Sequence, residues 1–154
     1  MGISEKALEI AITQLGKEEV PRGSNWGEPV QSYLKSVGIG FPASWCMAFV
    51  YWCHNEAAKQ LGIKNPMVKT GGVLMQWGKA SKVYAATKPY LPGDVFIMNY
   101  GKGLGHTGII EKMEGEFAHT IEGNTNDEGS REGYEVCRRK RPIAKFAGVL
   151  RFTK

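Results

Sequence analysis

The chain has 154 residues, a formal net charge of +5 and 23% charged residues, a composition typical of a globular protein. Its length predicts a single domain over residues 1–154, large enough to bury a hydrophobic core. The sequence shows no signal peptide and no run of about 18 apolar residues that could span a membrane, so we expect a protein made in the cytoplasm.

The first half of the chain predicts helices. Apolar residues recur at helical spacing over Ser4–Leu15 and Val30–Val37, and a glycine follows each segment. The stretch Phe41–Ala58, FPASWCMAFVYWCHNEAA, predicts a central helix with Ser44 as its N-cap. Because this helix is apolar on almost every side, we expect it to be buried. A short helix is predicted over Gly72–Ala80.

The second half predicts strands. Runs that alternate apolar and polar residues between turn signals are Val95–Asn99, His106–Lys112, Phe117–Glu122, Tyr134–Arg139 and Phe146–Arg151. Glu114-Gly115 is the predicted hairpin turn between the second run and the third. Helices followed by antiparallel strands predict an α+β fold, with N-terminal helices packed against a C-terminal antiparallel sheet.

The basic balance favours anionic partners, and nucleic acid, anionic lipid and anionic cell-wall polymer all qualify. The densest basic run is Arg138-Arg139-Lys140-Arg141, which we interpret as a solvated loop or strand edge. A nucleic-acid site would interleave more basic residues with stacking aromatic side chains. We therefore expect no nucleic-acid partner and no membrane partner.

Cys46 stands in the first turn of the predicted central helix. The free N–H groups and the positive dipole end of a helix favour an anion there, so a thiolate would be stabilised. Taken alone, a free cysteine is more often buried and inert, as we expect of Cys53 and Cys137. Three cysteines without C-x-x-C spacing predict neither a disulfide framework nor a metal site.

Amide hydrolysis by a cysteine also needs an imidazole and a group that orients it. His106 opens a predicted strand after the Gly-rich run GKGLG, so it should lie at the edge of the sheet. If the hairpin turns at Glu114-Gly115, the start of one strand lies beside the end of the next. This pairing places His106 next to Glu122 and Asn124. His54 lies about two helical turns from Cys46, too far for direct contact.

Side-chain alternation divides the strand Phe117–Glu122 between two faces. His119 shares the bulkier face with Phe117 and Ile121, which we expect on the far side of the sheet from the helices. Glu122 shares a face of small residues, onto which a helix can dock closely.

Four motifs follow one another in the order W-C-x-x-F-V, G-D-V, G-H-x-G and E-x-N. They are Trp45-Cys46-Met47-Ala48-Phe49-Val50, Pro92-Gly93-Asp94-Val95, Gly105-His106-Thr107-Gly108-Ile109 and Ile121-Glu122-Gly123-Asn124-Thr125. This set resembles the CHAP family of cysteine, histidine-dependent amidohydrolases/peptidases, which have a papain-like fold. Asn25-Trp26-Gly27 and Gly129-Ser130-Arg131-Glu132-Gly133 resemble one bacterial and phage branch of that family.

The resemblance implies a Cys-His-Glu-Asn site that needs no cofactor. Cys46 would be the nucleophile, His106 the general base and then acid, and Glu122 and Asn124 the residues that orient His106. We add two expectations about substrate binding. Asn25 is our candidate for a second oxyanion donor beside the Cys46 N–H, and Trp45 for a contact with the substrate.

The implied substrate is bacterial peptidoglycan, cut at an amide bond of the stem peptide or cross-bridge or at the sugar–peptide junction. Two alternatives stay open: an amide outside the wall, or a module that binds the wall without cutting it. We expect a monomer that acts on the cell wall after release by lysis or by a secretion system. If it is an antibacterial effector, an immunity or delivery protein would be a further partner.

Overall fold

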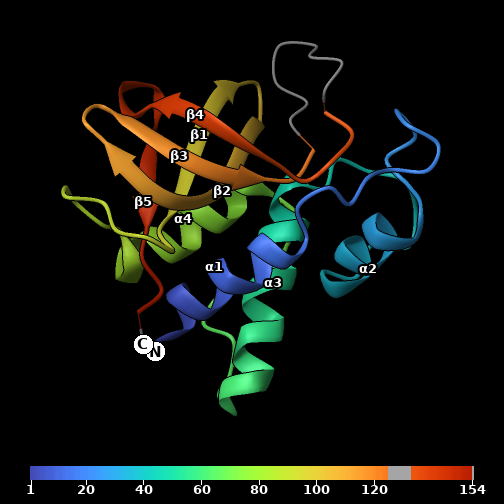
Figure 1. Ribbon diagram of the computed structural model, residues 1–154, viewed down its shortest axis with the longest axis horizontal. Coiled ribbons are helices and arrows are strands. Elements are labelled where there is room, and N and C mark those ends of the chain that lie inside the picture. The colour runs from blue at the N-terminus through green and yellow to red at the C-terminus, as the bar shows by residue number, and fades with distance from the viewer. Residues whose placement is uncertain (125–132, 154) are drawn as a thin grey trace.

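The computed structural model describes residues 1–124 and 133–153. Four helices come first: α1 (Ile3–Thr13), α2 (Glu28–Ser36), α3 (Cys46–Leu61) and α4 (Val73–Tyr84). The strands are β1 (Val95–Gly101), β2 (Leu104–Glu114), β3 (Phe117–Glu122), β4 (Cys137–Pro142) and β5 (Gly148–Leu150), with a 3₁₀ turn at Ile143–Lys145. The strands form one sheet in the order β4-β3-β2-β1-β5, with every pair antiparallel. The predicted α+β fold is confirmed (Figure 1).

α3 is the central helix of the core, as its all-round apolar sequence predicts. Its buried side chains pack with α1, α2 and one face of the sheet (Figure 1). The sheet residues in this main core are Val95, Ile97, Ile109, Ile121 and Leu150. The opposite face of the sheet carries a second, smaller cluster of Phe96, Met98, Ile110, Ala118, Ile143 and Val149. No helix of the described residues is long and apolar enough to cross a bilayer.

The prediction for the two faces of β3 is wrong. Ile121 faces the helices and belongs to the main core, whereas Ala118 lies on the opposite face with the second cluster. The helices need a bulky apolar surface, which Ile121 and its neighbours on β1 and β2 supply. The small side chains beside Glu122 make room instead for Arg141, which comes from β4. His119 lies at the surface, where it bonds to Glu114 at 2.6 Å.

Several element ends also differ from prediction. The N-caps are Gly2 and Trp45, not Ser4 and Ser44, and neither makes a side-chain cap. Ser4 Oγ instead donates to the Phe152 carbonyl at 3.0 Å. The fourth strand begins at Cys137, three residues later than predicted. Residues 125–132, which include most of the motif from Gly129 to Gly133, lie outside the described part of the chain.

Candidate active site

Cys46 is the first residue of α3. As a first-turn residue it has a backbone N–H without an acceptor inside the helix. It borders a small pocket of about 120 Å³. The other residues that line this pocket are Ser44, Tyr100, Leu104, Gly105, His106 and Asn124. The structure thus brings the predicted nucleophile, the predicted base and Asn124 to one concave site.

Trp45, immediately before Cys46, is held on several sides. Its ring stacks on Tyr33, with 5.6 Å between centroids, and its indole N–H donates to Glu19 Oε2 at 2.7 Å. A Cβ on Gly123 would lie 2.6 Å from the indole ring, so only glycine fits there. Because the side chain is 0% exposed, Trp45 cannot contact a substrate. The expected substrate contact is corrected: Trp45 fixes the start of α3.

His106 lies on β2, opposite Met98 of β1. Its Nε2 is 2.8 Å from Glu122 Oε1, so the hairpin does bring these two side chains together. Gly108 makes this contact possible, because a Cβ there would lie 2.6 Å from Glu122 Cγ. The second ring nitrogen of His106 remains for Cys46, with which the imidazole also interacts. The chain of contacts is Cys46–His106–Glu122.

Glu122 is completely buried and every bond it makes is to a donor. Thr120 Oγ1 donates to Oε2 at 2.6 Å, and Arg141 donates from Nε and Nη2 at 2.5 and 2.6 Å. Burial alone would raise the pKa of the carboxyl group, but the bonds from Arg141 and His106 lower it to about 2. Glu122 is therefore a carboxylate at any pH at which the protein is folded and active.

The charge state of His106 follows from its neighbours. Burial by itself would lower the pKa of the imidazole, but the adjacent Cys46 and Glu122 outweigh burial and raise it to about 9. An imidazolium between a sulfur and a carboxylate is the arrangement that a thiolate–imidazolium pair needs. At neutral pH the site therefore favours a protonated His106.

Asn124 has other partners than the imidazole. With its amide oriented to suit both neighbours, Oδ1 accepts from the Trp45 backbone N–H at 3.1 Å and Nδ2 donates to the Gly133 carbonyl at 2.6 Å. Its backbone has φ 44°, in the left-handed region that asparagine tolerates. The expectation that Asn124 orients His106 is corrected: within the described residues, Glu122 bonds the imidazole and Asn124 ties β3 to Trp45.

Asn25 lies in the loop before α2 and is half-buried, with φ 55°. It is not among the described residues that line the Cys46 pocket. Its proposed role as an oxyanion donor stays a prediction.

Arg141, Thr120 and Glu19 are parts of the site that sequence reasoning missed. Arg141 was placed in a solvated basic run, yet its residue is only 8% exposed and its guanidinium bonds Glu122. The signal was available, because alternation along a strand turns every second residue of such a run to the same face. A buried carboxylate beside a small-residue face requires a cation. Glu19 gave no comparable signal, since its burial depends on how the loop before α2 folds.

The other histidines and cysteines are not arranged for chemistry. His54 bonds the Val50 carbonyl through Nδ1 at 2.9 Å, and burial lowers its pKa to about 4. Burial likewise raises the pKa of Cys53 and brings that of Cys137 to about 11. Neutral, protonated groups of this kind are structural. Within residues 1–124 and 133–153, no group of three or more His, Cys, Asp or Glu is placed to hold a metal ion.

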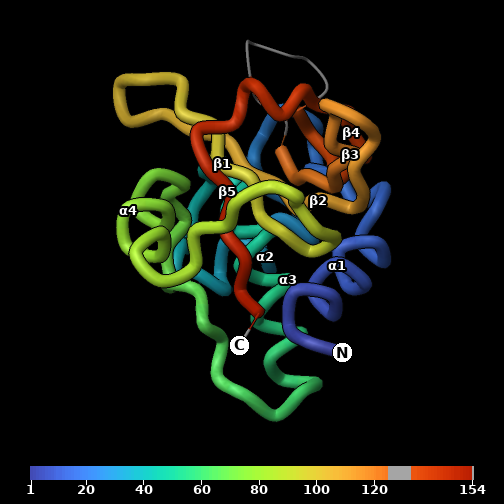
Figure 2. Tube along the Cα trace, turned by 90° about the vertical axis from the view of Figure 1, so that its left-hand side faces the viewer, coloured from blue at the N-terminus to red at the C-terminus, as the bar shows by residue number. Residues whose placement is uncertain are grey.

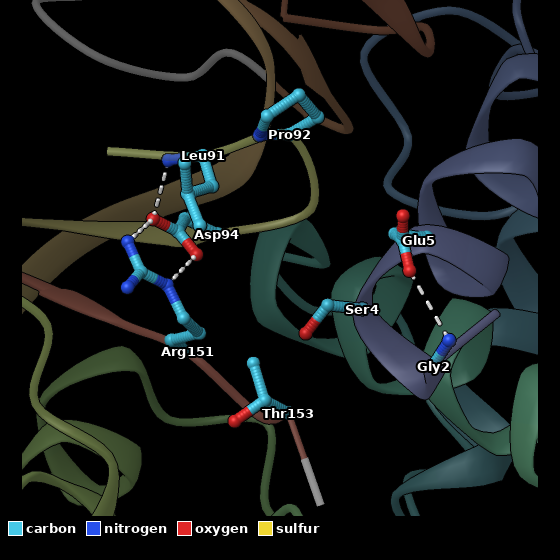
Figure 3. Close-up of a pocket in the computed structure, with 8 residues that line it drawn as sticks. All are labelled: Gly2, Ser4, Glu5, Leu91, Pro92, Asp94, Arg151 and Thr153. Atoms are coloured by element: carbon cyan, nitrogen blue, oxygen red, sulfur yellow. Dashed lines mark hydrogen bonds and ion pairs between the residues drawn. The ribbon is translucent and has the colours of Figure 1, made fainter. Parts of the chain in front are cut away.

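A larger hollow of about 510 Å³ lies beside the two chain ends. Figure 3 shows Ser4 and Thr153 on either side of it, with Asp94 and Arg151 forming one wall. Asp94 accepts from Arg151 Nε and Nη2 at 2.8 Å each and from the Leu91 N–H at 2.8 Å. The G-D-V motif therefore fastens the end of the chain to β1, and this hollow has no nucleophile in its lining.

Comparison with known proteins agrees with this geometry. A family model described as CHAP domain matches residues 37–124, more than half of the chain, though not Asn25. The fold is similar to the crystal structure of Ly7917, with a TM-score of 0.56 and 13% identity over 96% of this chain. It is also similar to the crystal structure of Ly7917 with the hydrolyzing product of MDP, with a TM-score of 0.55, 14% identity and 96% coverage. The chain spans 61% and 62% of those two chains, respectively, and no curated protein matches the sequence.

Proposed function

Because the chain belongs to the CHAP-domain family, we propose that it is a peptidoglycan hydrolase that cuts an amide bond by attack of the Cys46 thiolate. The observation that carries the proposal is the contact chain from Cys46 through His106 to a buried, ionised Glu122. This chain contains a nucleophile, a proton donor and acceptor, and an orienting carboxylate. It opens on the same pocket as the start of α3, where an oxyanion is favoured.

In the proposed reaction, the thiolate Sγ of Cys46 attacks the amide carbonyl carbon. The backbone N–H of Cys46 donates to the oxygen that becomes negative. The tetrahedral intermediate collapses as the C–N bond breaks, and the His106 imidazolium gives its proton to the leaving nitrogen. The products of this first half are a free amine and a thioester on Cys46.

Neutral His106 then takes a proton from water, whose oxygen attacks the thioester carbonyl. The C–S bond breaks, the acyl group leaves as a carboxylate, and the thiolate–imidazolium pair is restored. Through both halves, Glu122 holds Nε2 of the imidazole, so the other ring nitrogen stays directed at the sulfur and the substrate. Arg141 and Thr120 act on Glu122 alone.

The substrate part of the proposal rests on the family. Peptidoglycan contains amide bonds at the junction of sugar and peptide, within the stem peptide and in the cross-bridge. A pocket of about 120 Å³ beside Cys46 accommodates a small acyl side chain rather than a bulky one. The hydrolyzing product of MDP bound to Ly7917, a protein of similar fold, is consistent with a substrate of this class.

Product identification tests this proposal. Purified peptidoglycan is digested with the protein, and the released fragments are analysed by mass spectrometry and by labelling of new amines. We expect new amino groups in equal number to the bonds cut and no new reducing sugar ends. Release of reducing ends, or no release from peptidoglycan alongside cleavage of a protein or a small amide, would overturn it.

A further inference from the structure

The positive charge of the chain is concentrated in one segment. Between Glu56 and Asp94 the sequence has six lysines and no Asp or Glu, whereas the net charge of the whole chain is +5. The rest of the chain therefore has a net charge of −1. The segment includes the end of α3, the whole of α4 and the loops before and after α4.

Four of these lysines, Lys69, Lys79, Lys82 and Lys88, form what we call the α4 basic face. All four are exposed, and none forms an ion pair with any residue in the described ranges. Lys59 differs, because it pairs with Glu56 at 3.0 Å. Figure 2 shows α4 and the loops that flank it along the left and the front of the molecule, apart from α1 and α2. The charge is thus unpaired as well as concentrated.

The α4 basic face adjoins the candidate active site. Val73, the first residue of α4, packs on Gly105, where a Cβ would lie only 3.0 Å from Val73 Cγ1. Gly105 precedes His106 and lines the Cys46 pocket. A long polymer lying on α4 therefore ends close to the cleft that holds the nucleophile.

We propose that the α4 basic face binds a linear phosphodiester polymer of the cell wall and so keeps the enzyme on its substrate. The proposal rests on the proposed function, because that function brings the protein to the wall. Six lysines and no arginine in the segment supply mobile point charges rather than planar forks. Point charges suit a flexible chain of spaced phosphates, which offers no fixed geometry for bidentate bonding.

The same face fits two other polyanions less well. Single-stranded nucleic acid is held by exposed aromatic rings between the basic residues, whereas Trp77, Tyr84 and Tyr90 of this segment are half-buried. A helix that lies on a membrane has a broad apolar side with large residues. The only large apolar side chains that α4 exposes are Met75 and Val83.

The test is direct binding to immobilised poly(glycerol phosphate), with the full chain carrying Cys46→Ala so that hydrolysis plays no part. One variant adds Lys→Gln at the four positions of the α4 basic face. A matched control adds Lys→Gln at Lys17, Lys35, Lys112 and Lys145, which are exposed elsewhere and change the net charge equally. Double-stranded DNA and vesicles of equal phosphatidylglycerol and phosphatidylcholine serve as competitors at the same salt concentration.

We expect the α4 variant to lose at least about tenfold in affinity and its salt dependence to fall by roughly three, at ~0.7 per phosphate contact. The control should bind like the parent. Equal losses in both variants, unchanged binding by the α4 variant, or tighter binding of DNA or vesicles through the same lysines would each overturn the proposal. Since binding is measured without turnover, a failure here is separate from a failure to cut peptidoglycan.

Discussion

At the scale of single residues, the site depends on charges that burial would normally forbid. Glu122 is 0% exposed, yet four bonds from three donors keep it ionised. His106 is 2% exposed, yet it lies between that carboxylate and Cys46, so its pKa is raised to about 9. Each charge is stable only because its neighbours are in place, and removing one neighbour should therefore change the others in a defined direction.

The first such change is Glu122→Gln. An amide keeps a bond to His106 but removes the negative charge that favours the imidazolium, so the pKa of His106 should fall. We expect the alkaline limb of activity, near pH 9 in the parent, to move to lower pH. The matched control is Glu114→Gln, which removes a carboxylate bonded to surface His119. A limb that stays in place in Glu122→Gln, or moves equally in both variants, would show that Glu122 does not set the charge of His106.

The second change is Arg141→Met, which leaves the Glu122 carboxylate buried without its guanidinium. Breaking a buried ion pair from one side costs about 3–5 kcal/mol of unfolding free energy. Arg138→Met removes a guanidinium of the same strand, but that side chain is 55% exposed where it pairs with Glu111, so the cost should stay below about 1 kcal/mol. Urea denaturation measures both variants. Similar costs would contradict a structural difference between the two arginines.

At the scale of elements, glycines determine how closely the strands and α3 can approach. Gly105, Gly108 and Gly123 each lie where a Cβ would be within 2.8 Å of another atom. These glycines bring β2 against α4, Glu122 over β2, and β3 against Trp45. The motifs G-H-x-G and E-x-N therefore encode a packing geometry as much as a set of reactive groups.

Gly108→Ala should separate packing from chemistry. The added Cβ displaces Glu122 from His106, so we expect activity to fall by at least about tenfold although every reactive side chain is retained. Gly78→Ala in α4 is the control, because nothing lies within 4 Å of its Cβ position and alanine favours a helix by about 0.5–1 kcal/mol. Initial rates and thermal unfolding of both variants decide the matter. Full activity in Gly108→Ala would mean that Glu122 has room to move without consequence.

Much of this element scale was predictable from the sequence. The period of the apolar residues predicted all four helices, and the hairpin at Glu114-Gly115 predicted the approach of His106 to Glu122. The side of the sheet on which Glu122 lies was not predictable, because alternation gives two faces but not which one the helices cover. Arg141 depended on the register of β4, which no local turn signal fixes. Trp45 next to a reactive cysteine suggested substrate binding, and only its tertiary burial showed otherwise.

At the scale of the whole molecule, the titrating groups define a pH range of stability. The pKa of His106 is raised, so its contribution is fully present below about pH 6.5 and is lost as pH rises through 9. The pKa of His54 is lowered, so its neutral form contributes above about pH 6.5 and that contribution is lost as pH falls through 4. Glu122 contributes above its ordinary value of 4.5 and loses this only as pH falls through about 2.

We therefore expect the unfolding free energy to be greatest near pH 6.5 and to decline on both sides. His106→Gln should flatten the decline between pH 6.5 and 9, and His54→Gln the decline between 6.5 and 4. Denaturant titrations over this pH range measure both slopes. If the alkaline slope is the same in the parent and in His106→Gln, the imidazolium does not stabilise the folded state.

The central claim is that Cys46 performs the hydrolysis, and the initial rate of amine release from purified peptidoglycan tests it most directly. Parent and Cys46→Ala are compared at pH 7, with circular dichroism to confirm that both are folded. The account expects Cys46→Ala to release amines no faster than a blank without protein, while Cys53→Ala, which alters a buried and unreactive thiol, retains the parent rate. Equal rates for the parent and Cys46→Ala would contradict the account.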